Sequence, residues 1–332
     1  MSAARFAVTA IGNAIVDIIG RCDEDFLARH GAAKGSMRLV DAETVQRLYS
    51  EMGPAIEISG GSAANTMVGL ASFGGKAAFI GKVADDEFGR IFRHDIGAAG
   101  VAFETAAVSG KAPTSRSLIL VTPDGERTMN TFLGISTDLD QAEVDAATVT
   151  GAGVIYLEGY LFDQPHAMAA FRHAAALANN AGRAVALTLS DGFCVDRHRN
   201  AFLDFIRSDV DILFANEAEI ASLYETANFD EAANRAAADT KLAVLTRSAK
   251  GSLILADGVR HEIPVEPVAE VVDTTGAGDL YAAGFLYGLT SGADLATAGR
   301  LGSLAAAEII SHVGARPQTN LGELARSRGL IA

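Results

Sequence analysis

Short apolar segments alternate along the chain with longer alanine-rich segments, and this alternation constrains the fold more than any other feature of the sequence. The apolar segments have the length of buried strands, and the segments between them have the apolar spacing of helices. Strands are predicted at Phe6–Ile11, Ala77–Gly81, Val154–Glu158, Ala184–Leu189, Ile212–Ala215 and Leu242–Thr246. Helices are predicted at Ala167–Ala181, Asn200–Ser208, Asp230–Asp239, Leu280–Leu289 and Leu295–Ile310. This order predicts an α/β fold with three layers, in which helices cover both faces of an open, mostly parallel sheet.

Two segments, residues 15–40 and 101–133, depart from this pattern because apolar and polar residues alternate within them and turn residues interrupt them. The second contains Thr-Pro-Asp-Gly at 122–125, a strong turn sequence between two predicted strands, Ser117–Val121 and Arg127–Phe132. We expect both segments to form a small β-sheet lid appended to the main sheet. The sequence has no internal repeat and no Pro/Ser-rich linker, so residues 1–332 are expected to form a single domain that carries this lid.

Charge and hydropathy exclude several classes of partner. The 332 residues are 49% hydrophobic, enough for a large core, and they carry a formal net charge of −14. An acidic surface repels phosphate backbones and anionic lipids, so neither nucleic acid nor a membrane surface is expected as a partner. The sequence contains no apolar run of about 20 residues, the length that a membrane span requires. We expect a monomer, or a homodimer formed through an exposed edge of the lid.

The cysteines and the N-terminus indicate a cytoplasmic protein. Cys22 and Cys194 are the only cysteines in the sequence, and neither belongs to a Cys-x-x-Cys pair or a Cys/His ligand cluster. So few cysteines in a chain of this length fit a reducing compartment. The N-terminal apolar segment is interrupted by Gly12, Asn13 and Asp17, so it is interpreted as a first strand rather than a signal peptide.

The sequence Asp-Thr-Thr-Gly-Ala-Gly-Asp at 273–279 carries the most chemical information. It lies between a short apolar segment and a predicted helix. The first N–H groups of a helix have no partner within the helix and sit at its positive end, and glycine lets an anion approach them closely. The turn Gly276–Gly278 is therefore predicted to hold the charge of a transferring phosphoryl group. Asp279, at the start of the helix, is predicted to accept the proton of an attacking hydroxyl.

Other phosphate-binding motifs do not match the chain. The sequence lacks Gly-x-x-x-x-Gly-Lys-Ser/Thr, and Tyr281 occupies the position where a dinucleotide-binding fingerprint has its third glycine. For an isolated Gly-Ala-Gly, a plain turn with Asp279 as an ordinary helix cap would be the better interpretation. The full string from Asp273 to Asp279 is far more specific than that.

Three motifs, in this order along the chain, resemble the signatures of the ribokinase, or PfkB, family of carbohydrate and nucleoside kinases. The glycine-rich segment that begins Gly-Gly-Ser-Ala-Ala-Asn at 60–65 and ends at Gly89 is similar to the N-terminal signature. Asn-Glu-Ala-Glu at 216–219 resembles the Asn-x-x-Glu motif, and residues 273–279 are similar to the C-terminal signature. The resemblance covers essentially the whole chain. It implies a ribokinase-like three-layer α/β/α fold with a β-sheet lid that closes over the substrate.

The resemblance also implies a role for each matching residue. Asp279 matches the catalytic base of the family. The family's anion hole matches the turn residues Gly276, Ala277 and Gly278. Asn216 and Glu219 match the motif that organises Mg²⁺ and phosphate, usually through water, so ATP and Mg²⁺ are the expected cofactors.

On the substrate side, the Asn and Asp that face the substrate from the family's first strand match Asn13 and Asp17. Asp17 lies in an apolar stretch, where a carboxylate is costly to bury unless donors such as the hydroxyls of a ribose reach it. Gly61 and Asn65 match further substrate contacts, because glycine allows close approach and asparagine can both donate and accept. Arg127 occupies a position common in the family, and its role stays open between the site and a surface ion pair.

On the nucleotide side, the segment from Thr246 to Gly251 resembles the family's ATP loop, with Ser248 in place of its usual first glycine. Gly314 matches the C-terminal loop near the adenine. Some members of the family bind a monovalent cation near this loop and the strand that precedes the phosphate turn. Thr275 is therefore expected near the nucleotide, and Asp273 is the candidate ligand for K⁺.

The lid sequence indicates which acceptor is bound. Its side chains resemble in placement those that surround the base in the adenosine kinases of this family: Met37, Leu39, Met129, Thr131, Phe132 and Leu133. Phe162 resembles an aromatic near the purine, whereas Glu158 resembles a carboxylate that some sugar kinases direct at sugar hydroxyls. We therefore predict transfer of the γ-phosphate to adenosine, giving AMP. A kinase for ribose, fructose or a related sugar and a non-catalytic nucleotide-binding relative are the alternatives.

Overall fold

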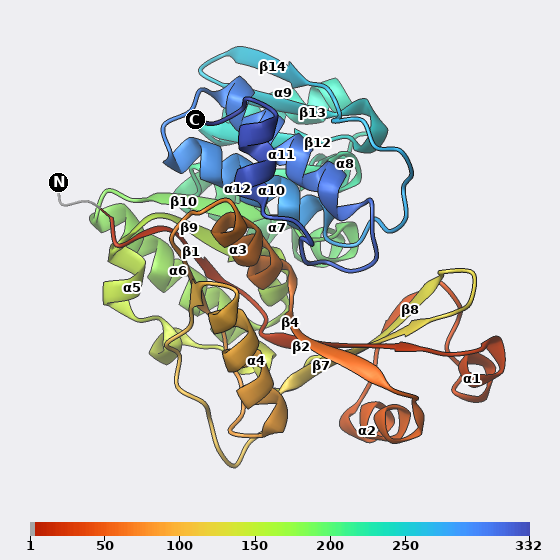
Figure 1. Cartoon of the computed structure of the whole chain (residues 1–332). Coiled ribbons are helices and arrows are strands. Elements are labelled where there is room, and N and C mark those ends of the chain that lie inside the picture. Colours follow the sequence, from red (N-terminus) through yellow and green to blue (C-terminus); the bar gives the residue numbers. More distant parts are fainter. Residues whose placement is uncertain (1–3) are drawn as a thin grey trace.

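The computed structural model describes residues 4–332, and its larger part, the body, is built around one sheet (Figure 1). Within the described residues this sheet has nine strands in the order β14-β13-β12-β11-β10-β9-β1-β5-β6. Neighbouring strands from β6 to β12 run parallel, and β13 and β14 follow as an antiparallel hairpin. The strands are β1 (Phe6–Ile11), β5 (Ala77–Ile80), β6 (Val101–Ala102), β9 (Ala152–Glu158), β10 (Ala184–Thr188), β11 (Ile212–Asn216), β12 (Leu242–Thr246), β13 (Ser252–Ala256) and β14 (Val259–Ile263). All the body strands predicted from the apolar runs lie in this sheet, so that part of the prediction is confirmed.

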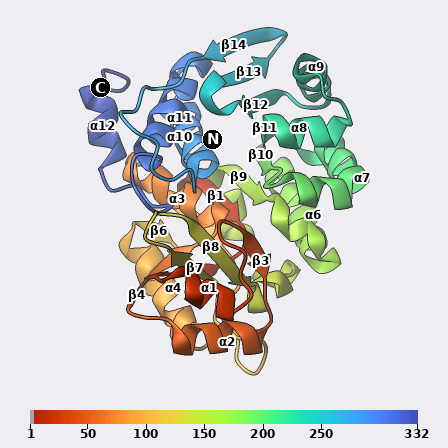
Figure 2. The ribbon, with the colours of Figure 1, turned by 90° about the vertical axis from the view of Figure 1, so that its right-hand side faces the viewer.

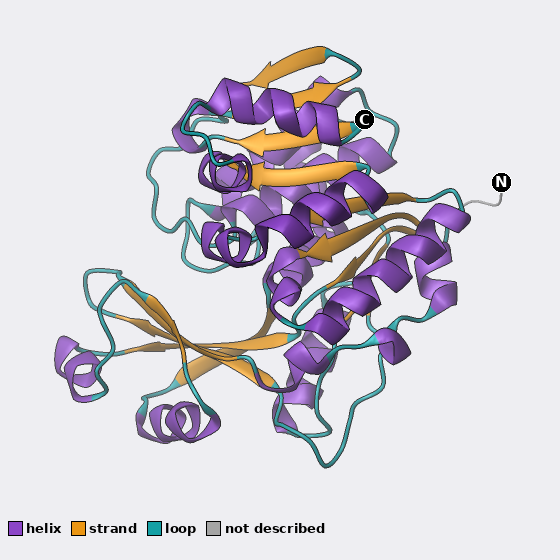
Figure 3. Ribbon diagram, turned by 180° about the vertical axis from the view of Figure 1, so that it is seen from behind, coloured by secondary structure: helices purple, strands orange, loops and turns teal. Residues whose placement is uncertain are grey.

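Helices cover both faces of the sheet, which makes the body a three-layer α/β/α structure (Figure 3). Successive strand residues point to opposite faces, and Tyr156 and Ile155 of β9 accordingly belong to different hydrophobic clusters. The helices on the face of Tyr156 are α3 (Ser62–Ser72), α4 (Glu87–Ala98), α10 (Ala277–Thr290), α11 (Leu295–Ile309) and α12 (Leu321–Ser327). The helices on the face of Ile155 are α5 (Ala146–Thr150), α6 (Pro165–Asn180), α7 (Gly192–Asp209), α8 (Glu217–Tyr224) and α9 (Phe229–Asp239). No helix within residues 4–332 is both long and apolar enough to cross a membrane.

The smaller part, the lid, is a separate sheet that projects from the body (Figures 1 and 2). Its strands within the described residues, in spatial order, are β3 (Met37–Leu39), β8 (Arg127–Phe132), β7 (Ser115–Val121), β2 (Ile15–Arg21) and β4 (Ala55–Gly60). Two helices, α1 (Glu24–Arg29) and α2 (Ala42–Glu51), are attached to it. Asp17, Ser117, Thr131 and Leu39 form one row across neighbouring strands, so they share one face of the lid sheet. Leu39 is 61% exposed, which shows that this face is not covered by the lid helices.

The boundaries of the lid differ from the prediction. β4 belongs to the lid but lies outside both predicted segments, while β6, which the second segment included, pairs with β5 in the body. Helix α1 lies inside the first segment, where only strands were expected. Its start was recognisable, because the side chain of Asp23 caps it and Glu24 and Asp25 occupy its first turn.

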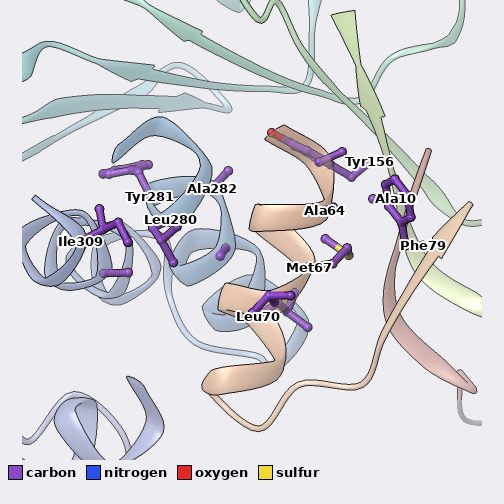
Figure 4. Packing of buried hydrophobic residues seen from close by; sticks show 14 of the residues in the cluster. Ala10, Ala64, Met67, Leu70, Phe79, Tyr156, Leu280, Tyr281, Ala282 and Ile309 are labelled. Atoms are coloured by element: carbon purple, nitrogen blue, oxygen red, sulfur yellow. The ribbon is translucent and has the colours of Figure 1, made fainter. Parts of the chain in front are cut away.

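Helix α10 packs tightly between α3 and α11. Figure 4 shows Leu280 of α10 lying between Leu70 of α3 and Ile309 of α11. The close approach of α11 depends on Gly284, because a Cβ there would clash with the backbone oxygen of Leu301. The helix that carries the phosphate turn is thus fixed by a contact that only glycine permits.

Substitution of Gly284 by alanine should lower the free energy of unfolding by about 1–3 kcal/mol, the usual cost of overpacking a core. Urea denaturation followed by circular dichroism would measure it. Gly97 of α4 is the matched control, because a Cβ there would meet no atom within 4 Å. G97A should leave stability unchanged or raise it by up to about 1 kcal/mol through helix propensity. Equal effects of the two substitutions would contradict this account of the packing.

Candidate active site

The turn before α10 places backbone donors beside open space. Gly276 caps the helix with φ 78°, in the left-handed region that favours glycine. A Cβ at Gly276 would lie 3.0 Å from Ala315, whereas a Cβ at Gly278 would meet no atom within 4 Å. An anion can therefore approach Gly278 and the first N–H groups of α10, which have no partner within the helix.

Asp279 lies in the first turn of α10 and is held by two side chains of α3. Ser62 Oγ donates a hydrogen bond to Asp279 Oδ1 at 2.6 Å, and Asn65 Nδ2 donates one to Oδ2 at 3.1 Å. Burial raises the pKa of Asp279, and these two hydrogen bonds and the charge of Arg316 oppose the rise. A carboxylate with a raised pKa is a stronger base, so Asp279 is suited to take a proton from a hydroxyl. Asn65 Oδ1 is buried and has no partner among the described residues, which leaves it able to accept a hydrogen bond from a ligand.

Asp17, on strand β2 of the lid, provides a second carboxylate near Asp279. Its carboxylate lies so close to Gly60 that a Cβ there would clash with it. Burial raises the pKa of Asp17 to about 6, the charges of Arg316 and Arg127 oppose the rise, and the charge of Asp279 adds to it. Asp17 and Asp279 thus act on each other electrostatically, although they come from opposite ends of the sequence.

Asn13 and Gly61 meet where β2 and α3 begin. Gly61 has φ 98°, and a Cβ there would clash with the carbonyl oxygen of Asn13, so both the conformation and the contact require glycine. Glu158, which is 1% exposed, accepts hydrogen bonds from Asn13 N at 3.1 Å, Asn13 Nδ2 at 2.7 Å and Ala63 N at 2.9 Å. Ser136 Oγ donates to Asn13 Oδ1 at 2.8 Å. The carboxylate expected to point at sugar hydroxyls is instead engaged by protein donors, and it fixes Asn13 and the start of α3.

Two adjoining cavities meet at the phosphate turn. The smaller one has a volume of about 90 Å³ and its lining includes Ser62, Gly278, Asp279, Asn216, Glu219 and Thr246. The larger one, of about 450 Å³, has apolar walls that include Val265, Val268, Val271, Ala307 and Ile310. Asn216, Thr246, Gly278 and Tyr281 line both cavities. A chamber that contains polar groups beside Asp279 therefore opens into a mainly apolar chamber, as the phosphates and the base of a nucleotide require.

The predicted nucleotide residues divide into two groups. Thr246 and Gly251 line the larger cavity, together with Ser248. Ser248 has φ 51°, so the serine that replaces the family's glycine keeps the backbone conformation that glycine favours. Thr275 and Gly314 instead donate their backbone N–H groups to Asp273, each at 2.9 Å.

The role of Arg127, which the sequence left open, follows from its partner. Arg127 Nη1 on the lid forms an ion pair with Asp273 Oδ2 on the body, and both side chains are less than 10% exposed. This is a buried link between lid and body rather than a surface ion pair. The carboxylate of Asp273, the candidate K⁺ ligand, already receives this guanidinium and two backbone N–H groups. A positive charge of the protein thus lies where a monovalent cation was expected.

Asn216 and Glu219 form a capping box at the start of α8. Asn216 Oδ1 accepts from Glu219 N at 2.8 Å, and Glu219 Oε2 accepts from Asn216 N at 2.9 Å. Glu219 is 6% exposed, and burial raises its pKa to about 7, so it is not a solvated helix residue. Among the described residues, no group of three or more His, Cys, Asp or Glu side chains is placed to hold a metal ion. A divalent cation would therefore need oxygens from a bound nucleotide in addition to Glu219.

Two aromatic residues predicted at the substrate site lie elsewhere. Phe162 is 3% exposed and stacks on Phe202 at a centroid distance of 3.8 Å, inside the hydrophobic core. Phe132 is three residues from Met129 on the same strand, so the two side chains point to opposite faces of the lid. Phe132 lies near the buried guanidinium of Arg116, on the face opposite Asp17.

Met37, which was predicted at the substrate site, and two aromatic residues that were not predicted there are exposed. Met37 is 51% exposed and pairs with Met129 on the face of the lid that carries Asp17. Tyr160 is 36% exposed, and its hydroxyl donates to the carbonyl oxygen of Ser190, which lines the smaller cavity. Phe193 is 77% exposed. Tyr160 could have been suggested from the sequence, because it lies two residues after the end of the parallel strand β9, and ligands bind at this end of the strands in open α/β sheets. Phe193 lies in the first turn of α7, and no sequence signal indicated it.

A half-buried carboxylate beside a helix-capping glycine turn, facing a lid and two adjoining cavities, is the arrangement of a phosphotransferase site on a three-layer α/β fold. The model of the pfkB family of carbohydrate kinases matches residues 55–320. The chain therefore belongs to the PfkB family of sugar and nucleoside kinases. The ribokinase-like fold predicted from the three motifs is confirmed.

Several relatives show how broad the range of acceptors in this family is. The chain is 52% identical to adenosine kinase from Sinorhizobium meliloti, with a TM-score of 0.90 over 98% of this chain and 100% of that one. It is also 52% identical to a probable sugar kinase from Rhizobium etli, with a TM-score of 0.91 over 99% and 100% of the two chains. An ATP-dependent ribose-1-phosphate kinase from Halopiger xanaduensis is 31% identical over 68% of this chain and 72% of its own length.

Replacing Glu158 by glutamine should change how stability depends on pH. Burial raises the pKa of Glu158 from 4.5 to about 7, so the folded protein binds this proton more tightly than the unfolded chain does. The corresponding stability is present below about pH 4.5 and is lost as the pH rises through about 7. E158Q should therefore lose less stability than the wild type between pH 5 and pH 8, as measured by urea denaturation.

The matched control is Glu323→Gln, because Glu323 is exposed in the first turn of α12. E323Q should reproduce the pH dependence of the wild type. A wild-type pH dependence in E158Q would show that Glu158 does not titrate in this window.

Proposed function

We propose that this protein transfers the γ-phosphate of ATP to the hydroxymethyl group of a ribose, most specifically the 5′-hydroxyl of adenosine. One observation carries the proposal: Asp279 lies beside the phosphate turn, where the small polar cavity joins the large apolar one. Asp17 and the unpartnered Asn65 Oδ1 lie next to Asp279 on the lid side and on α3. The acceptor hydroxyl, the carboxylate of Asp279 and the N–H groups that bind the phosphoryl group can therefore lie close together.

Each residue of the site has a separate role in the proposed reaction. Asp17 and Asn65 are suited to bind the ribose hydroxyls, because both present oxygen acceptors at the edge of the cleft. Asp279 takes the proton from the 5′-oxygen as that oxygen bonds to the γ-phosphorus and the bond to ADP breaks. The N–H groups of the turn Gly276–Gly278 stabilise the charge on the moving phosphoryl group. Arg127 holds the lid against the body and so excludes water.

The nucleotide fits the cavities by their chemistry. The apolar walls of the larger cavity suit an adenine base, and Thr246 and Asn216 lie at its junction with the polar cavity. Mg²⁺, bound with the nucleotide near Asn216 and Glu219, would neutralise part of the phosphate charge. Glu219 is suited to this role because its carboxylate is buried and fixed by the capping box.

The apolar side chains around the acceptor side favour a nucleoside over a free sugar. Met37 and Leu39 of the lid are more than half exposed, and a free sugar would leave such surface in water. Tyr160, whose hydroxyl bonds to Ser190 of the smaller cavity, adds an exposed ring that can stack on a purine. The likeness to adenosine kinase from Sinorhizobium meliloti supports the same acceptor. The second candidate is a sugar kinase, supported by the relatives that act on ribose-1-phosphate or are described as sugar kinases.

Substitution of Asp279 by asparagine should reduce kcat by about 10²-fold or more, because the general base is lost while the shape of the site is kept. ATP binding, measured by calorimetry, should remain close to that of the wild type. Asp257→Asn, at an exposed turn far from the site, is the matched control and should be fully active. A fully active D279N enzyme would rule out this mechanism.

Alanine substitution of Tyr160 should separate the two candidate acceptors. Loss of one stacking partner should raise KM for adenosine about 3- to 10-fold, from the usual energy of an aromatic pair. KM for ribose should not change, and Val259→Ala at a remote exposed position should affect neither substrate. A screen of adenosine, inosine, ribose and fructose with the wild type establishes the acceptor first. Turnover of sugars alone would favour the sugar kinase.

A further inference from the structure

A short segment after α11, Gly314–Arg316, touches three separate parts of the site. Gly314 N donates to Asp273, which forms the ion pair with the lid. Ala315 packs against the phosphate turn, since a Cβ at Gly276 would lie 3.0 Å from it. Arg316 then extends away from the turn toward the connection between β4 and α3.

The guanidinium of Arg316 binds both ends of this connection. Arg316 Nε donates to the carbonyl oxygen of Ser59 at 3.0 Å, and Nη2 donates to Ser59 Oγ at 2.9 Å. On the other side, Nη1 donates to the carbonyl oxygen of Ala64 at 3.3 Å. Ser59 is itself fixed, because its N and Oγ donate to Asp95 Oδ2 at 2.8 Å and 2.5 Å. Arg316 thereby links β4, an edge strand of the lid, to α3, the helix whose side chains bind Asp279.

These partners of Arg316 are neutral oxygens, so its charge is left to act on carboxylates farther away. The carboxylates on which it acts are Asp95 of α4, Asp17 of β2 and Asp279 of α10. Burial lowers the pKa of Arg316 to about 10, and the group is therefore still charged at neutral pH. Asp17 also faces Arg127 of β8. The other ionisable groups that face Asp279 are Tyr156 and Glu158 of β9, Tyr160, and Glu219 of α8, so Arg316 supplies the opposing positive charge.

We propose that Arg316 is a positioning residue, which fixes the Ser59–Ala64 connection so that Ser62 and Asn65 hold Asp279, and which places a positive charge near the Asp279 carboxylate. The inference rests on the proposed phosphotransfer, and it adds a residue that lies outside all three family motifs. Arg316 acts through α3 and through its charge, and makes no contact with the reacting atoms.

The test compares Arg316→Gln, which removes the charge, with Arg316→Lys, which keeps it but loses the forked hydrogen bonds. Without the positive charge, Asp279 holds its proton to higher pH. The acid limb of the kcat/KM profile in R316Q should therefore move upward by about one pH unit, on the usual scale of a nearby opposite charge. Activity should recover partly at high pH. R316K should keep the wild-type acid limb and lose activity by the same factor at every pH.

Hydrogen exchange provides a readout that does not depend on catalysis. In both variants the amides of residues 59–66 should exchange at least 10-fold faster than in the wild type, while those of α6 should not change. Arg260→Gln, which alters an exposed arginine on β14, should match the wild type in both measurements. Unchanged exchange at residues 59–66 would overturn the proposal. So would an R316Q variant that, like R316K, loses activity by the same factor at every pH. A wild type that phosphorylates no acceptor would refute the proposed function, and the exchange result would still decide whether Arg316 fixes α3.

Discussion

The arrangement of the site depends on how the protein stabilises four carboxylates in one cleft. The same cleft must also bind a negatively charged nucleotide, so repulsion between these charges has to be offset. Burial raises the pKa of Asp17, Glu158, Glu219 and Asp279. These four carboxylates are compensated in three ways. Glu158 and Glu219 accept backbone and amide hydrogen bonds, Asp279 accepts from a hydroxyl and an amide, and Asp17 faces two arginines. Glu158 and Glu219 thus fix the structure around the site, whereas Asp17 and Asp279 are the carboxylates to which the proposed function assigns the substrate.

The fold brings these groups together because the body sheet and the lid sheet meet at the site, and each sheet contributes different residues. The carboxyl ends of the parallel strands in the body deliver Glu158 and Asn216 to one edge. β1 continues through Asn13 into β2, so the lid grows directly out of that edge. The alternation of side chains in the lid then decides which residues face the body. The row through Asp17 faces the cleft, and the neighbouring rows pack against α1 and α2.

Local signals explain what the sequence could predict and what it could not. The body strands were predictable from apolar runs. Motifs selected Asp17, Asn65 and Asp279, and the structure joins the last two by a hydrogen bond. Phe162 and Phe132 were placed wrongly because a resemblance in position ignores which way a side chain points. Arg316 carried no signal at all, since its partner Ser59 lies 257 residues away in the chain and only the folded structure brings them together.

The two halves of the reaction are encoded at opposite ends of the chain. The groups suited to bind the acceptor, Asp17 and Asn65, are made first, whereas the phosphate turn and Arg316 follow near the C-terminus. During synthesis Asp17 and Asn65 therefore emerge from the ribosome well before the residues of the phosphate turn. A copy that ends before residue 273 would lack both the proposed base and the proposed anion hole, so it could not carry out the proposed transfer.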